Sequence, residues 1–422
     1  MHKIIELENG LKIVMEKIDG VNSVSVGVMI KNGSRNEEPR LNGISHFIEH
    51  MFFKGTETRT FNKITSEIEN IGGQINAFTG KESTCYFVKV LGSHIEKGLD
   101  VLSDIILNSK FDKDEIEKEK GVVVEEINMS TDSPEEVLED LHATISYKDS
   151  ELSYPILGTE EKVRSFTRED IIEYIEEKYA PKNSVISICG KVDYEEIESL
   201  VRKYFSTWKN KKEYNHVYEE VEVSSGTGFI EKEIEQLHIN ISYRGLKYNH
   251  PKSYALVLVN NILGGGASSI LFQKVREELG LCYSIYSYMD SYKECGGMNV
   301  YLGLNKNSAT KALEVINEAV ENFVQNGITE EALKINKEKI KGTFILGQES
   351  TSSKMFANGK SLLFRGKIRT EEEVLEKIDE ITMEDVNFVI KECFRSGAVN
   401  TVYVGQKVNI EDLNSIIFKK NF

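Results

Sequence analysis

The stretch IEKGLDVLSDIILNSKFDKDEIEKEKGVVVEEI, residues 95–127, is similar to ATKALEVINEAVENFVQNGITEEALKINKEKIKGTFIL, residues 309–346. Each stretch reads as a helix, a short break and a second helix. A second pair of similar stretches, residues 165–200 and 380–416, lies at nearly the same offset. That offset, roughly 215 residues, is far longer than the unit of a solenoid, so the pattern predicts a duplicated domain.

Each half also carries strand-like segments around its helices. Apolar and polar side chains alternate, as they do in strands, over residues 21–30 and 236–245. Short apolar runs, also typical of strands, occur at residues 184–190 and 400–405. Elements in this order predict an α+β fold of two homologous domains, each a mainly antiparallel sheet covered by helices. The charged stretch 208–228 reads as a linker, which predicts domains over 1–207 and 229–422.

The composition is typical of a globular protein, with 422 residues, 40% hydrophobic and 28% charged. No apolar run approaches the ~18 residues of a membrane span, and acids interrupt the N-terminal segment where a secretory signal would be apolar. The five cysteines show no Cys-x-x-Cys spacing, which favours a reducing cytoplasm. The net charge of −16 disfavours nucleic acid as a partner and mildly favours cationic substrates.

Residues 46–56, HFIEHMFFKGT, place two of the eight histidines four positions apart. Apolar residues recur at helical spacing around them, which predicts a helix over 41–53. His46 and His50 then leave one face of that helix about 5–6 Å apart at Cβ, close enough to share a zinc ion. Glu49 adjoins them and could accept a proton from a water molecule. The alternative is a helix with two polar histidines at its rim.

A catalytic zinc needs a third protein ligand, and the acid-rich helix predicted over 112–129 offers several carboxylates. Glu119 and Glu126 are seven residues apart and share one stripe of that helix. Glu125 is an equally suitable carboxylate, and periodicity does not decide between the two neighbours. Most acids on such a helix are solvated by default.

The order His-x-x-Glu-His is the inverted zinc motif of the inverzincins. With GISHFIEHMFFKGT (43–56), IGGQINAFTGKEST (71–84) and EKEKGVVVEEI (117–127), the chain resembles the pitrilysin family of zinc metallopeptidases over essentially its whole length. It is nearest to the beta subunit of mitochondrial processing peptidase and its bacterial two-domain relatives. The resemblance implies one zinc ion per chain, held by His46, His50 and Glu126. It makes Glu49 the general base and Glu119 a second acid that supports the metal site.

Residues 72–90 begin with a glycine pair that suits a tight turn and continue as a predicted strand. From the residues alone this strand is an ordinary sheet edge. In the resembled family the edge pairs with substrate, at positions that fall here on Asn76, Ala77, Phe78 and Thr79. A peptide that adds itself as another strand is bound through its main chain and need not have a strict sequence.

The second half lacks the zinc motif, and its corresponding region, residues 260–288, contains the run Gly264–Gly266. This run lacks the spacing of a nucleotide-binding loop. The resemblance instead implies a substrate-binding pair, Arg276 and Tyr283, which would grip the peptide backbone and stabilise the oxyanion. Relatives commonly have an arginine where this chain has Ile270, which weakens any inference about selectivity.

These features predict a cytoplasmic zinc endopeptidase for short or unfolded peptides, with its two domains arranged as half of a clam-shell. The resemblance implies a homodimer around an enclosed chamber, in which each chain supplies Arg276 and Tyr283 to the zinc site of its partner. Neither nucleic acid nor membrane is expected as a partner. Two alternatives stay open: a non-catalytic scaffold subunit of the same fold, and an active subunit that requires a separate glycine-loop partner.

Overall fold

The computed structural model describes residues 2–212, 218–394 and 396–418. Residues 213–217 of the predicted linker lie outside the described residues. The described residues form two compact units. The first unit takes its residues from Met1–Met129, Tyr154–Val217 and Ile345–Arg369, and the second from Ser130–Ser153, Tyr218–Phe344 and Thr370–Phe422.

The first unit is built on a six-stranded sheet of order β1-β2-β6-β3-β5-β4. Only the β2–β6 pair is parallel. The central strands β3 and β6 are buried along nearly their whole length, whereas the edge strand β4 alternates between exposed and half-buried residues. The strands are β1 (His2–Glu6), β2 (Lys12–Lys17), β3 (Ser23–Ile30), β4 (Gln74–Thr79), β5 (Thr84–Leu91) and β6 (Ser184–Gly190).

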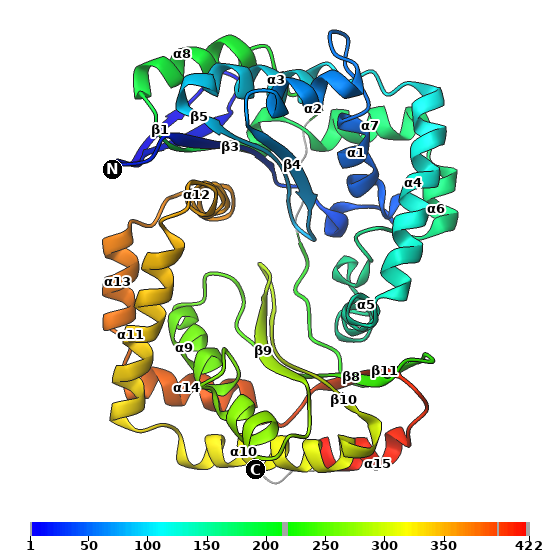
Figure 1. The fold of residues 1–422 in the computed structure, drawn as a ribbon, viewed down its shortest axis with the longest axis vertical. Coiled ribbons are helices and arrows are strands. Elements are labelled where there is room, and N and C mark those ends of the chain that lie inside the picture. The colour runs from blue at the N-terminus through cyan, green and yellow to red at the C-terminus, as the bar shows by residue number, and fades with distance from the viewer. Residues whose placement is uncertain (1, 213–217, 395, 419–422) are drawn as a thin grey trace. The chain divides into compact units, whose positions relative to one another are not determined.

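Helices cover one face of this sheet and enclose its main hydrophobic core (Figure 1). The helices whose apolar faces enter this core are α1 (Ile44–Phe52), α2 (Phe61–Glu69), α3 (Ile95–Leu107), α4 (Lys113–Asp132), α6 (Glu160–Ser165), α7 (Arg168–Lys178) and α8 (Tyr194–Phe205).

The second unit repeats the topology of the first. Its five-stranded sheet has the order β7-β11-β8-β10-β9, which corresponds strand by strand to β2-β6-β3-β5-β4, and its parallel pair is again the first one. The strands are β7 (Gly226–Glu231), β8 (Gln236–Arg244), β9 (Ser284–Ser291), β10 (Gly296–Asn305) and β11 (Asn400–Gly405). The helices of its core are α9 (Ser253–Leu263), α10 (Ala309–Asn326), α11 (Glu330–Gly347), α13 (Glu371–Asp379), α14 (Met383–Phe394) and α15 (Ile410–Ile417). The predicted α+β fold with two mainly antiparallel sheets is confirmed.

Each unit also contains one helix from the other half of the sequence. α12 (Thr351–Arg365) packs on β3 and β6 of the first sheet, and α5 (Pro134–Ser146) packs on β11, β7 and β8 of the second (Figure 1). A Cβ atom on Gly359 of α12 would overlap Met29, and one on Gly27 of β3 would overlap Met355. Backbone and side chain therefore interlock at two places. The compact units thus differ from the continuous ranges 1–207 and 229–422, because the sequence pattern does not show which sheet a helix covers.

Two predicted elements have different limits in the structure. The helix predicted over 41–53 is α1, which begins only at Ile44 because Gly43 has the left-handed φ of 98°. The single strand predicted within residues 72–90 is a hairpin of β4 and β5 that turns at residues 80–83, so only β4 lies at the edge of the sheet. Among the described residues, none of the helices combines the length and the apolar character needed to cross a bilayer.

Candidate metal centre

The start of helix α1 is held by a buried carboxylate. Glu37 accepts hydrogen bonds from the backbone N–H of Gly43 (2.7 Å), the backbone N–H of Ser45 (2.8 Å) and the side-chain amide of Asn42 (2.9 Å). Burial raises the pKa of Glu37 to about 7, although these hydrogen bonds act in the opposite direction. The carboxylate satisfies N–H groups that have no partner within the helix, so α1 begins at a fixed position.

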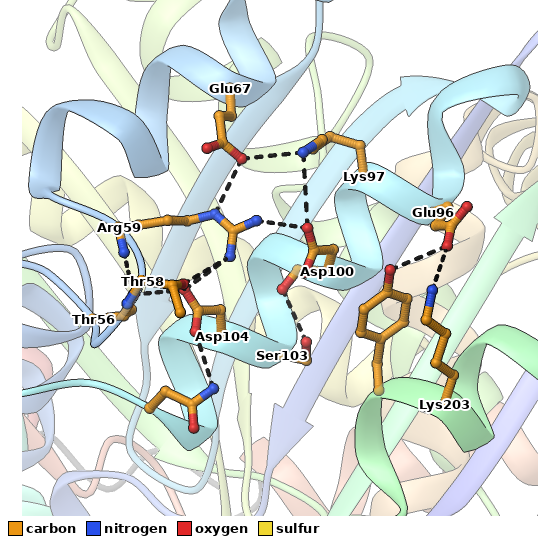
Figure 2. Close-up of polar contacts among 12 residues, drawn as sticks. Thr56, Thr58, Arg59, Glu67, Glu96, Lys97, Asp100, Ser103, Asp104 and Lys203 are labelled. Carbon is orange, nitrogen blue, oxygen red and sulfur yellow. Dashed lines mark hydrogen bonds and ion pairs between the residues drawn. The ribbon is translucent and has the colours of Figure 1, made fainter.

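Figure 2 shows how the segment that follows α1 is anchored to α3. Asp104 accepts hydrogen bonds from Thr56 (2.6 Å), Thr58 (2.8 Å) and the Arg59 guanidinium (2.8 Å). Arg59 also pairs with Asp100 at 2.5 Å and with Glu67 at 3.1 Å. Only 9% of the Arg59 side chain is exposed. The start of α1 and the segment that follows it are therefore each fixed by a buried carboxylate, Glu37 and Asp104.

The structure brings His46, His50 and Glu126 together. The Nε2 atom of His50 lies 3.2 Å from Oε2 of Glu126, and that of His46 lies 3.7 Å from Oε1. The two imidazole rings have centroids 4.7 Å apart. One ligand atom from each residue lies within 4.8 Å of the others, the sole such group among the described residues. Glu125 is exposed. Of the two neighbouring acids between which periodicity did not decide, the geometry therefore favours Glu126 as the third ligand.

Glu119 contacts His50 on the ring nitrogen that faces away from Glu126, and its supporting role stays a prediction. Its Oε1 is 2.8 Å from His50 Nδ1, and its Oε2 is 2.6 Å from Lys54 Nζ. Burial disfavours the charged imidazolium of His50, but its hydrogen bonds with Glu119 and Glu126 outweigh this and raise its pKa to about 9. For His46, burial and the neighbouring His50 lower the pKa to about 4. The carboxylates thus stabilise positive charge where a divalent cation would sit.

Two nitrogen donors and one carboxylate are the ligand set of hydrolytic zinc sites, which keep a fourth position for water or substrate. The residues present therefore fit a zinc ion. Burial raises the pKa of Glu49, and a short hydrogen bond from Thr79 Oγ1 to its carboxylate partly offsets this. A carboxylate with a raised pKa is a better proton acceptor near neutral pH than an ordinary one. The contact of Thr79 with Glu49 was not foreseen from the sequence.

The predicted substrate-binding residues form an open edge beside this centre. Asn76, Ala77, Phe78 and Thr79 lie on β4, which among the described strands pairs only with β5 and ends the sheet. The Phe78 side chain is 44% exposed and packs edge-on against Phe356 of α12, with ring centroids 5.5 Å apart. The free side of β4 offers backbone donors and acceptors to an added strand.

Arg276 and Tyr283 belong to the second unit. Arg276 lies in the π-helix η6 (Phe272–Glu278). Its guanidinium stacks over the rings of Phe272 at 4.6 Å and Tyr283 at 5.7 Å. It lines a cavity of about 460 Å³ together with the run Gly264–Gly266, and Tyr283 is 73% exposed. The pair is preformed, and its role in catalysis stays a prediction.

Glu37 and Arg59 were missed by the sequence analysis. Both lie in polar stretches, SRNEEPR and KGTETRT, that read as solvated loops. No signal in the sequence distinguishes these two charged residues from solvated ones.

Comparison with known proteins identifies close relatives of the whole chain. Residues 12–160 match the family Insulinase (Peptidase family M16), and residues 165–340 match the family Peptidase M16 inactive domain. The chain is 42% identical over 394 residues to a Bacillus subtilis protein named uncharacterized zinc protease YmxG, covering 93% of this chain and 96% of that protein. A Mycobacterium leprae protein, also named an uncharacterized zinc protease, is 36% identical over 90% of this chain and 86% of its own.

Solved structures show the same fold. A protease from Helicobacter pylori superposes with a TM-score of 0.90 at 24% identity, over 96% of this chain and 99% of that one. A structure described as a peptidase M16 inactive domain from Pseudomonas fluorescens superposes with a TM-score of 0.87 at 17% identity, over 97% and 98% of the two chains. The similarity extends through both units.

Proposed function

Because this chain belongs to the M16 family of insulinase-type peptidases, we propose that it is a zinc-dependent endopeptidase acting on short or unfolded peptides. The predicted resemblance to a zinc metallopeptidase family is thereby confirmed. The observation that carries the proposal is the convergence of His46, His50 and Glu126 beside the half-buried Glu49. A scaffold protein without catalytic activity has no need of this combination.

The residues of the centre have distinct parts in the proposed reaction. A zinc ion bound there would supply Lewis acidity, which polarises the scissile carbonyl and acidifies a water molecule. Glu49 accepts the proton of the attacking water and later donates it to the leaving amine. Thr79 fixes the orientation of the Glu49 carboxylate through its hydrogen bond. Glu119 holds His50 by its Nδ1 atom, so that Nε2 faces the metal position.

The substrate is held as an additional strand along β4. Main-chain hydrogen bonds with Asn76, Ala77, Phe78 and Thr79 would place an extended segment beside Glu49, whose partner Thr79 ends that strand. Recognition through the main chain accepts many sequences but requires an extended peptide. A folded protein rarely offers such a segment, which supports short or unfolded peptides as the substrates.

The decisive variant is Glu49→Gln, which removes the proton acceptor without removing a ligand. We expect the variant to retain zinc, measured by atomic emission, and to lose hydrolysis of a quenched fluorescent peptide library. Glu125→Gln is the matched control, since it makes the same change on an exposed carboxylate. Retained activity in Glu49→Gln, or loss of zinc from it, would contradict the assignment.

Arg276 and Tyr283 are proposed to bind the peptide backbone and the developing oxyanion from the partner chain of a homodimer, around a shared chamber. The stacked, preformed guanidinium supports a binding role. Glu49→Gln and Arg276→Ala proteins, each inactive alone, are mixed under conditions that exchange subunits. Random exchange makes about half of the dimers mixed, and each mixed dimer has one intact site, so roughly a quarter of all sites should recover. If Arg276 served its own chain, mixing would restore nothing.

A requirement for a separate glycine-loop subunit makes a different prediction. The purified chain alone would then stay inactive on every peptide, although it binds zinc. Activity of the homogeneous protein would exclude that alternative.

The expected cytoplasmic location is a separate proposal, and fractionation of the native cells would test it.

A further inference from the structure

A cavity of about 590 Å³ in the first unit is lined by five lysines: Lys12, Lys31, Lys182, Lys211 and Lys212. No aspartate or glutamate belongs to the described residues that line it. The chain as a whole has 68 acidic and 52 basic residues, so an average part of its surface should carry negative charge. We call this cavity the lysine pocket. None of its lining residues belongs to the metal centre or to β4.

The order of the strands places three of these lysines at one end of the sheet. Lys12 is the first residue of β2, Lys31 follows the last residue of β3, and Lys182 lies two residues before β6. β6 runs between β2 and β3, with Lys12 opposite Val185 and Ile30 opposite Ser184. Since neighbouring strands lie about 4.8 Å apart, the three backbone positions fall within roughly 10 Å of one another.

The other two lysines lie on the segment that follows α8. Lys211 pairs with Glu176 at 2.8 Å, and Lys212 pairs with Glu173 at 3.2 Å, both on α7. Asn210 fixes the segment beside the sheet, because its Oδ1 accepts a hydrogen bond from the backbone N–H of Lys182 at 3.3 Å. Lys12 and Lys182 form no ion pair with any described residue. The mutual repulsion of these ammonium groups would therefore be relieved by a bound anion.

The neutral donors of the lining are already used by the fold. Asn183 donates its side-chain amide to the carbonyl oxygens of Lys31 and Lys178, each at 3.0 Å, and Ser184 donates its hydroxyl to Ala180 at 2.8 Å. Ammonium groups, with three N–H donors each, are thus the groups a ligand would meet. Val185, Leu362 and Leu363 supply an apolar part of the wall.

We propose that the lysine pocket binds a small soluble anion with at least two adjacent phosphate groups. The volume lies within the range of small-molecule sites. Lysine binds phosphate as a compact point charge. Five lysines line the pocket, and three of them begin from backbone positions up to roughly 10 Å apart, which favours a ligand with more than one phosphate group. The site is separate from catalysis, so it does not depend on the proposed peptidase activity.

Isothermal titration calorimetry, in which inorganic tripolyphosphate is added to the full-length protein, tests the proposal. The pocket variant is Lys12→Gln/Lys182→Gln. The control is Lys306→Gln/Lys311→Gln, which changes the net charge equally at two exposed lysines of the second unit. We expect one tripolyphosphate per chain, bound about tenfold or more weakly by the pocket variant and within about twofold of wild type by the control, since each lysine contributes a charge-assisted hydrogen bond. Tripolyphosphate can also chelate zinc, but this effect would be the same in both variants and could not cause a difference between them.

Equal weakening in both variants would show nonspecific attraction and overturn the proposal, as would the absence of binding to wild type at millimolar tripolyphosphate. Inorganic monophosphate that bound as tightly as tripolyphosphate would refute the need for adjacent phosphates, and a hexaglutamate peptide that bound more tightly would refute the phosphate ligand. If the double variant did not fold, Lys182→Gln, at an exposed position, replaces it. Tripolyphosphate should then raise the melting temperature of wild type more than that of this variant, and an equal rise would again overturn the site.

Discussion

The packing of α12 against the first sheet predicts opposite effects for the same substitution at two helical glycines. Gly359 lies inside α12, where an added Cβ would overlap Met29 Sδ and lie 3.1 Å from Ser187 Cβ. Met29 is only 5% exposed and has little room to move. Gly342 lies inside α11, where no atom of the described residues comes within 4 Å of an added Cβ.

Alanine is favoured over glycine in a helix by about 1 kcal/mol, and overpacking a core costs about 1–3 kcal/mol. Gly342→Ala should therefore stabilise the protein by up to about 1 kcal/mol. Gly359→Ala gains the same helix preference but also bears the overpacking, so it should be destabilising by about 1 kcal/mol. The two variants should differ by about 2 kcal/mol, or roughly 4–8 °C in the melting temperature of a unit of this size.

Differential scanning calorimetry of the full-length protein would measure this difference. Gly121→Ala in α4, another helical glycine with open space around its Cβ position, is a second control and should behave as Gly342→Ala does. A Gly359→Ala protein as stable as the two controls would show that α12 does not pack on Met29, and the exchange of helices would be wrong.

Further predictions concern the metal centre and its supports. Glu126→Gln should weaken zinc binding strongly in competition with a chelator, whereas Glu125→Gln should leave it unchanged; the reverse would move the third ligand by one position. Glu119→Gln should raise the zinc dissociation constant by about 10–100-fold while the folded structure is retained, because it disturbs the partner of His50 Nδ1. Burial raises the pKa of Glu37 from 4.5 to about 7, so its contribution to stability is fully present below pH 4.5 and is lost as the pH rises through 7. Glu37→Gln should remove that dependence, up to about 3 kcal/mol, and a pH profile of melting temperature identical to wild type would contradict this.

The metal-binding face could be predicted from sequence because it depends on local spacing alone. His46 and His50 are four residues apart on a helix with an apolar face, and this is sufficient to place both imidazoles on one side. The choice between Glu125 and Glu126 needed the fold. It depends on the rotation of α4 about its axis, which is set by buried residues such as Val123 and Val124.

Longer-range features could not be predicted from the same patterns. Glu37 is buried and only 9% of the Arg59 side chain is exposed, and a polar loop sequence gives no sign of either. An amphipathic pattern indicates that one face of a helix is buried, but it does not indicate against which sheet. The partner of α12 is decided by interlocking shapes, Gly359 against Met29 and Gly27 against Met355, which no periodicity records.

The exchange of α5 and α12 between the units bears on how the chain folds as it is synthesised. The first sheet has all of its strands once residue 190 has been made, but the helix that covers its second face ends at Arg365. Until the ribosome has passed that point, buried residues such as Met29, Cys85 and Cys189 have no cover. A nascent chain of about half length therefore exposes an apolar sheet face, which is the kind of surface that chaperones bind and that aggregates. The first unit has all of its residues only once Arg369 has been made, so a stop codon after the first half should yield an insoluble fragment and not a free-standing domain.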